Sequence, residues 1–210
     1  MSHCTKYDFT YSNEEAIVKA FGKMNIKCST EIVSTFATEI GKKFLSKIGY
    51  IGIKQCRAIV GKYGVYQLFA CKVAEDKYEL LVEYSGQIGA KQEREMKEIE
   101  KSFRIAYMSV AVDKIVKKLK DSGMSSSVRQ NDNRFIVEFG PLSEYSVTIT
   151  FDNNQIIEDV HGVKGDFCTK LTEDIEDLLS SPVAELQTEW KVEYTMPVEE
   201  QALQVLSLNF

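Results

Sequence analysis

The chain has 210 residues, of which 44% are apolar and 27% charged, an ordinary globular balance that excludes wholesale disorder. Its longest apolar runs are far shorter than the roughly 18 residues that span a bilayer, and its first residues lack the basic and apolar regions of a secretory signal. With a formal net charge of -5 and no expected membrane segment, we expect the protein in the cytoplasm, in the plastid stroma or in the cytoplasm of a virus-infected cell.

The first fifty residues predict a strand and two helices. Residues 2–11 alternate as in a strand, and Ser12 followed three residues later by Glu15 is the signature of a capping box that starts a helix. Residues 29–48 repeat apolar side chains at helical spacing, which predicts a second helix. Both apolar stripes are typical of core-facing helices.

Three short runs of β-type residues follow, and the short turns between them predict an antiparallel meander. These runs are residues 56–60, 65–73 and 78–84. Residues 92–121 are rich in helix formers, which predicts one long helix or two helices joined near Ser109. Gly123 ends this pattern, and a hairpin that turns on residues 131–133 follows it.

The last third of the chain predicts two strands, a helix and a final strand. The expected elements are residues 145–151, 156–160, a helix ending at Leu179, and 185–194. Residues 198–210 form an apolar end that either packs on the body or binds something else. The whole pattern predicts an α+β fold, with an antiparallel sheet covered by helices on one face and then a small ββαβ unit.

The charges divide unevenly along the chain. Residues 1–143 carry 23 Lys and Arg against 17 Asp and Glu, a net charge of +6, whereas residues 144–210 carry 3 against 14, a net charge of -11. We therefore predict a basic first domain, 1–143, and a small acidic second domain, 144–210. Their opposite charges could attract one another, or the acidic part could bind a basic partner.

Several of these features resemble two families without an established activity. Residues 1–3, the glycine turn at 49–52, the meander and the long helix with its hairpin resemble the family called hypothetical chloroplast reading frame thirty-five. Residues 149–179 resemble a second small bacterial family, through the sequence Gly-Val-Lys-Gly at 162–165 followed by Cys168. Genes of these families are similar to genes that lie next to the genes for AAA+ ATPases. This resemblance implies an accessory or adaptor role.

The glycine loop is one candidate site, since a loop that leads from a strand into a helix exposes backbone N–H groups to an anion or a partner. Its residues are Gly162, Lys164 and Gly165. The alternative is a structural turn in which Asp166 caps the helix. Cys168 lies in the first helical turn and is a candidate nucleophile, with His161 near it in sequence; the alternative is a small buried core residue.

A second candidate is a basic cluster for nucleic acid, which could instead simply complement the dipole of its own helix. It contains Lys114, Lys117, Lys118, Lys120, Arg129 and Arg134. The five cysteines lie at wide, irregular spacings and are interpreted as reduced, mostly buried thiols, so we expect no metal site and no cofactor.

Together these observations favour a non-catalytic accessory or adaptor protein that binds a protein partner, in particular an AAA+ ATPase. The sequence has no Gly-x-x-x-x-Gly-Lys-Ser/Thr loop, so nucleotide hydrolysis would belong to that partner. Two alternatives stay open: a small thiol-dependent enzyme or redox protein that uses Cys168, and a nucleic-acid-binding protein that uses the basic cluster. The sequence favours protein over nucleic acid as the partner and leaves homo-oligomer formation open.

Overall fold

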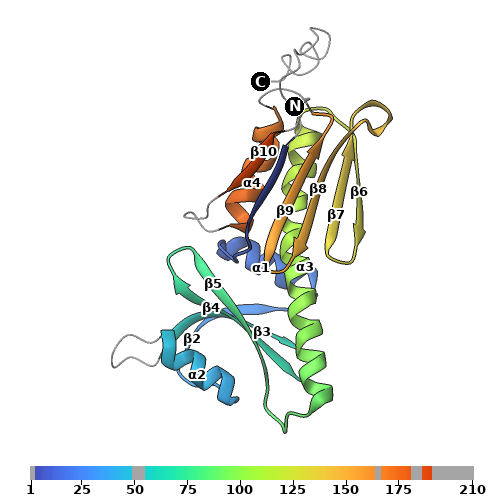
Figure 1. Ribbon diagram of the computed structural model, residues 1–210. Coiled ribbons are helices and arrows are strands. Elements are labelled where there is room, and N and C mark those ends of the chain that lie inside the picture. Colours follow the sequence, from blue (N-terminus) through green and yellow to red (C-terminus); the bar gives the residue numbers. More distant parts are fainter. Residues whose placement is uncertain (1–2, 49–54, 164–166, 181–185, 191–210) are drawn as a thin grey trace. The chain divides into compact units, whose positions relative to one another are not determined.

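The computed structural model describes residues 3–48, 55–163, 167–180 and 186–190 (Figure 1). The helices are α1 (Glu14–Lys23), α2 (Glu39–Ile48), α3 (Ala90–Asp121) and α4 (Phe167–Leu179), with a short 3-10 helix η1 (Pro141–Ser143). The strands are β1 (His3–Asp8), β2 (Cys28–Val33), β3 (Cys56–Tyr63), β4 (Tyr66–Ala74), β5 (Lys77–Tyr84), β6 (Ser126–Asn131), β7 (Arg134–Phe139), β8 (Tyr145–Asp152), β9 (Gln155–His161) and β10 (Gln187–Trp190). Because all strand pairs are antiparallel, the α+β class predicted from the sequence is confirmed.

The described chain divides into two compact units. Unit 1 contains the residues before Thr10 and after Val110, and unit 2 is Thr10–Val110, so helix α3 contributes residues to both. This division differs from the boundary predicted after residue 143, because β7 and β8 pair across that point from Arg134↔Thr150 to Phe139↔Tyr145. The net charge of a segment reflects its surface side chains, whereas a folded unit is defined by strand pairing and packing. The change of charge near residue 143 therefore does not mark the boundary between the two units.

Unit 1 is built on a six-stranded sheet in the order β10-β1-β9-β8-β7-β6. The predicted order of β8, β9, α4 and β10 is present, but these strands share one sheet with β1, β6 and β7 instead of forming a separate unit. In Figure 1, helix α4 and the last turns of α3 lie on one side of this sheet. The buried apolar residues of the unit include Phe135, Val137, Phe139, Val147, Ile149, Ile156 and Val160 from the strands and Ile115, Leu119, Leu171, Ile175 and Leu178 from the helices.

Unit 2 contains the predicted meander, in a four-stranded sheet of order β2-β3-β4-β5. Gly64 has φ +59 in the tight turn between β3 and β4, a conformation that favours glycine. The predicted long helix is the single helix α3. The predicted hairpin belongs to unit 1, where it is formed by β6 and β7, with Asp132 at φ 53 in its turn.

The helix predicted over residues 29–48 is wrong in its first half, where the chain forms strand β2. The β-branched residues Thr30, Ile32 and Val33 favour an extended backbone, and β2 pairs antiparallel with β3 from Cys28↔Gly61 to Val33↔Cys56. Only the second half, from Glu39, is helical. The pattern of apolar residues at helical spacing therefore combined side chains from a strand, a loop and a helix.

The cap of helix α1 is also shifted by one residue from its prediction. Asn13, not Ser12, is the N-cap, and its Oδ1 accepts a hydrogen bond from the Ala16 backbone N–H at 3.0 Å. The Tyr107 hydroxyl on α3 accepts hydrogen bonds from the backbone N–H groups of Ser12 at 3.1 Å and Asn13 at 3.2 Å. The backbone N–H groups at the start of α1 therefore have hydrogen-bond acceptors on the Asn13 side chain and on Tyr107 of α3.

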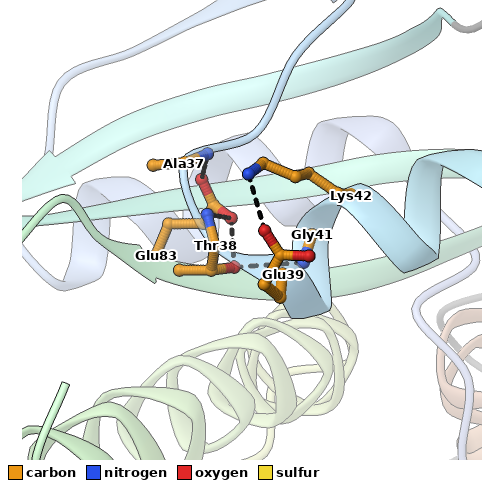
Figure 2. A network of polar contacts seen from close by, with 6 residues as sticks. All are labelled: Ala37, Thr38, Glu39, Gly41, Lys42 and Glu83. Atoms are coloured by element: carbon orange, nitrogen blue, oxygen red, sulfur yellow. Dashed lines mark hydrogen bonds and ion pairs between the residues drawn. The ribbon is translucent and has the colours of Figure 1, made fainter. Parts of the chain in front are cut away.

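A carboxylate from strand β5 accepts hydrogen bonds at the start of helix α2 (Figure 2). Glu83 on β5 is only 3% exposed and accepts hydrogen bonds from the N–H of Ala37 at 2.7 Å, the N–H of Thr38 at 3.0 Å and the Thr38 hydroxyl at 2.5 Å. The Thr38 Oγ1 in turn accepts from the Gly41 N–H at 3.0 Å. A Cβ on Gly41 would collide with the Glu83 carboxylate and with Phe36, so glycine is required there. The negative charge at the helix start also matches the helix dipole.

Replacing Glu83 by alanine is expected to lower the free energy of unfolding of unit 2 by about 2–4 kcal/mol, because three donors at the start of α2 lose a charged acceptor. Urea denaturation would measure the loss, and hydrogen exchange should show faster exchange at the Thr38 and Gly41 amides. Glu79→Ala, at an exposed position of the same strand, is the matched control and should change little. Equal losses in the two variants would contradict the capping role.

Candidate functional site

Unit 1 contains an open groove of about 310 Å³ between helix α4 and the strands β1 and β10. It is lined by Thr5, Thr169, Thr172, Glu173, Glu176, Thr188 and Trp190, and we refer to it as the threonine groove. All of its lining residues belong to helices or strands, and none lies in a loop.

Two strands supply one wall of the threonine groove. Thr5 on β1 lies opposite Thr188 on β10, and their hydroxyl oxygens are 3.1 Å apart, within hydrogen-bond distance. Thr5 is 1% exposed, so this contact forms a buried base. Trp190 is two residues beyond Thr188, and since side chains alternate along a strand, both point to the same face of the sheet. Trp190 is 48% exposed and forms the accessible wall.

Helix α4 supplies the opposite wall through a regular spacing. Thr169, Thr172, Glu173 and Glu176 follow one another at i, i+3, i+4 and i+7, the positions that share one face of a helix. The buried apolar residues of the same helix are Cys168, Leu171, Ile175, Leu178 and Leu179, and Thr172 is buried as well. The sequence therefore gives α4 one apolar face and one face of hydroxyls and carboxylates.

The electrostatics of the groove centre on Glu176. Burial raises the pKa of the Glu176 carboxyl above its ordinary value, and the neighbouring Asp177 and Glu173 raise it further. The Thr172 hydroxyl donates a hydrogen bond to Glu176 Oε1 at 3.4 Å and lowers this pKa. Carboxylates beside a half-exposed indole ring form a site that attracts a cation, since both the carboxylate charge and the face of the ring are negative.

The predicted glycine loop is only partly described. Gly162 has φ +78, and a Cβ on this residue would lie 2.7 Å from the Glu144 carbonyl oxygen, so glycine is needed for a close approach of two backbone segments. This favours the structural turn at Gly162. Lys164, Gly165 and Asp166, and the apolar end 198–210, lie outside the described residues.

Cys168 lies at 0% exposure in the first turn of α4, as a small apolar core residue does. His161, the other residue of the predicted nucleophilic pair, is exposed at the end of β9. The Cys168 thiol is therefore not accessible to solvent in this structure. A catalytic role for Cys168 stays a prediction.

The basic cluster is divided by its contacts. Lys118 forms an ion pair with Asp174 at 2.9 Å and donates a hydrogen bond to the Lys170 carbonyl oxygen at 2.6 Å, so it joins α3 to α4. Arg129 forms an ion pair with Glu138. The remaining members, Lys114, Lys117, Lys120 and Arg134, are exposed. The Lys118–Asp174 ion pair links one residue of the basic part of the chain to one of the acidic part. Nucleic-acid binding stays a prediction.

Comparison of the chain with protein-family models, with curated proteins and with solved structures finds no match. Among the residues that the structure describes, no helix has the length and hydrophobicity required to cross a membrane. The same residues contain no group of three or more His, Cys, Asp or Glu side chains arranged for a metal ion. All five cysteines are described, and no disulfide joins them.

The sequence did not single out Thr5, Thr188 or Trp190, because these residues come from opposite ends of the chain and meet only through strand pairing. Two signals existed: Trp190 is the single tryptophan of the chain, and the hydroxyl and carboxylate residues of α4 have helical spacing. From the sequence alone, Glu173 and Glu176 fit the solvated face of an amphipathic helix, so their carboxylates do not stand out as a site.

Replacing Glu176 by glutamine is expected to raise the free energy of unfolding at neutral pH. Because the pKa of Glu176 is raised on folding, the stability contributed by its protonated form is fully present below the ordinary value of 4.5 and is lost as pH rises through the folded value. The glutamine variant should therefore match wild type at low pH and become the more stable protein above the folded pKa.

Chemical denaturation over a series of pH values would measure this difference. Glu144→Gln is the control, since it neutralises an exposed carboxylate of the same unit that does not line the groove. A gain for Glu176→Gln that does not depend on pH would show that titration of Glu176 is not its cause.

Proposed function

We propose that this chain is a non-catalytic accessory or adaptor protein that binds a partner protein through the threonine groove. The observation that carries the proposal is the half-exposed Trp190 beside the carboxylates of Glu173 and Glu176. A lysine or arginine side chain fits this chemistry, because the indole face attracts the cation and the carboxylates accept its hydrogen bonds. We therefore propose a basic segment of the partner as the occupant.

The size and construction of the groove support a peptide side chain as its occupant. A volume of about 310 Å³ is near the lower limit of small-molecule pockets, which are roughly 300–1,000 Å³, and suits one or two side chains. Its walls are a helix and two strands, and the contact between Thr5 and Thr188 closes its base. A site on regular elements is held in place before binding, which reduces the entropy lost when a partner binds.

We further propose that this partner is an AAA+ ATPase. The support is the resemblance of residues 1–3, 49–52 and 149–179 to families whose genes are similar to genes beside such ATPases. The lack of a phosphate-binding Gly-x-x-x-x-Gly-Lys-Ser/Thr loop agrees with a division of labour in which the partner hydrolyses the nucleotide.

Tryptophan fluorescence can test binding in the groove directly, because Trp190 is the only tryptophan and reports on this site alone. Peptides rich in Lys and Arg should shift its emission in a saturable manner, and acidic peptides of equal length should not. The double variant Glu173→Gln/Glu176→Gln should bind about tenfold more weakly, since it loses two charge interactions.

The single variant Glu144→Gln is the matched control, because it removes one exposed carboxylate of unit 1 outside the groove and should retain wild-type affinity. An equal loss in Glu144→Gln would indicate attraction to the overall negative charge. An unchanged affinity in the double variant would refute the groove as the binding site.

The identity of the partner can be tested by affinity capture from the source cells on the wild-type chain and on the double variant, followed by mass spectrometry. An AAA+ ATPase should be enriched on the wild type and depleted on the variant. Recovery of such an ATPase on both would support the partner and contradict the groove, whereas recovery of no protein partner would contradict the adaptor role.

A further inference from the structure

Two buried thiols, Cys56 and Cys71, lie in the same apolar cluster of unit 2. Cys56 is 6% exposed and Cys71 is 0% exposed. The cluster also contains Val33, Phe36, Leu45, Ala58, Val60 and Phe69. Leu45 comes from helix α2, so this helix covers the face of the sheet on which the two thiols lie.

The register of β3 and β4 explains why the two side chains meet. Cys71 lies directly opposite Ala58, and Cys56 is two residues before Ala58. Side chains two residues apart point to the same face of a strand, so Cys56 and Cys71 are diagonal neighbours on one face. Both side chains also belong to the same buried apolar cluster, which agrees with their placement on one face of the sheet.

The position of Cys56 in its strand permits the movement that a disulfide needs. A disulfide requires Cβ atoms about 3.8 Å apart, closer than most diagonal pairs. The pairing of β3 with β4 begins at Ala58, so Cys56 precedes the first paired residue and is held by β2 alone, opposite Val33. Cys56 can therefore approach Cys71 without disruption of the β3–β4 ladder.

The same contact distinguishes the two thiols chemically. The hydrogen bond from Cys71 lowers the pKa of the Cys56 thiol, although burial acts in the opposite direction. The pKa of the Cys71 thiol is raised, first by this hydrogen bond and then by burial, with smaller effects from Glu79 and Glu83. Since the thiolate is the reactive form, Cys56 is the residue expected to react first.

We propose that Cys56 and Cys71 form an oxidisable dithiol that closes to an intramolecular disulfide when the protein meets hydrogen peroxide. The Cys56 thiolate attacks one peroxide oxygen, the O–O bond breaks, and hydroxide leaves, which gives a sulfenic acid on Cys56. The Cys71 sulfur then attacks the Cys56 sulfur, the S–O bond breaks, and the Cys71 proton leaves with the hydroxyl group as water. The two thiols are oxidised by two electrons in total, and the peroxide is reduced.

Peptide mapping by mass spectrometry tests the proposal on the full chain. Peroxide treatment, alkylation in denaturant and protease digestion should give a peptide pair that contains Cys56 and Cys71 and is joined by a disulfide sensitive to reductant. If instead both cysteines remain alkylatable after treatment, or Cys56 is linked to Cys28 on the neighbouring strand β2, the proposal is overturned. This measurement uses the wild-type protein and does not depend on the folding of a variant.

Variants then test which residues are required. Cys56→Ala and Cys71→Ala should each abolish the disulfide, and Cys28→Ala should retain it. Glu83→Ala should speed disulfide formation several-fold over wild type, because it removes the acceptor that holds the first turn of α2. Glu79→Ala removes a similar charge effect on Cys71 but leaves this cap intact. Equal rates in the two variants would contradict the role of α2 as the cover.

Discussion

The pairing of strand β1 with β9 on one side and β10 on the other is the interaction on which unit 1 depends. β10 is at the end of the sheet order, with β1 as its neighbour, so its four residues are attached to the sheet through the first strand of the chain. This pairing sets Thr5 opposite Thr188 and His3 opposite Trp190. The threonine groove therefore exists only when the two distant ends of the described chain have met, a contact that is slow and entropically costly to form because of its sequence separation.

The parts of the fold that the sequence predicted well are those specified by local chemistry. The meander has short turns, including Gly64 at φ +59, and its strands carry β-branched and aromatic residues. The error over residues 29–48 arose where local patterns are ambiguous: Val33 and Phe36 belong to one buried cluster, yet they lie on a strand and on the loop after it. Apolar residues that are buried in this strand and loop happen to have the spacing expected of a helix. Only the pairing with β3 shows that this segment begins as a strand.

The sequence identifies the acidic residues and the cysteines, but it does not predict which of them lie next to one another in the fold. The cysteines were expected to be reduced and mostly buried, and Cys56, Cys71 and Cys168 are buried without a disulfide. Contact between Cys56 and Cys71 follows from strand register, and a shift of one residue would place them on opposite faces. The charge contrast at residue 143 was real, but β7 and β8 pair across it. Composition thus identified the charged groups, whereas non-local pairing determined their neighbours.

Helix α4 shows how one acidic segment can divide its charges between stability and binding. Asp174 is compensated by Lys118 at 2.9 Å, whereas Glu176 is half-buried with a raised pKa, which means that its ionised form destabilises the folded protein. A cation bound in the groove would favour the ionised carboxylate and lower this pKa, so binding would recover free energy that folding alone does not. In the proposed adaptor, the carboxylate that destabilises the fold is therefore also a group whose interaction with a basic partner contributes to binding.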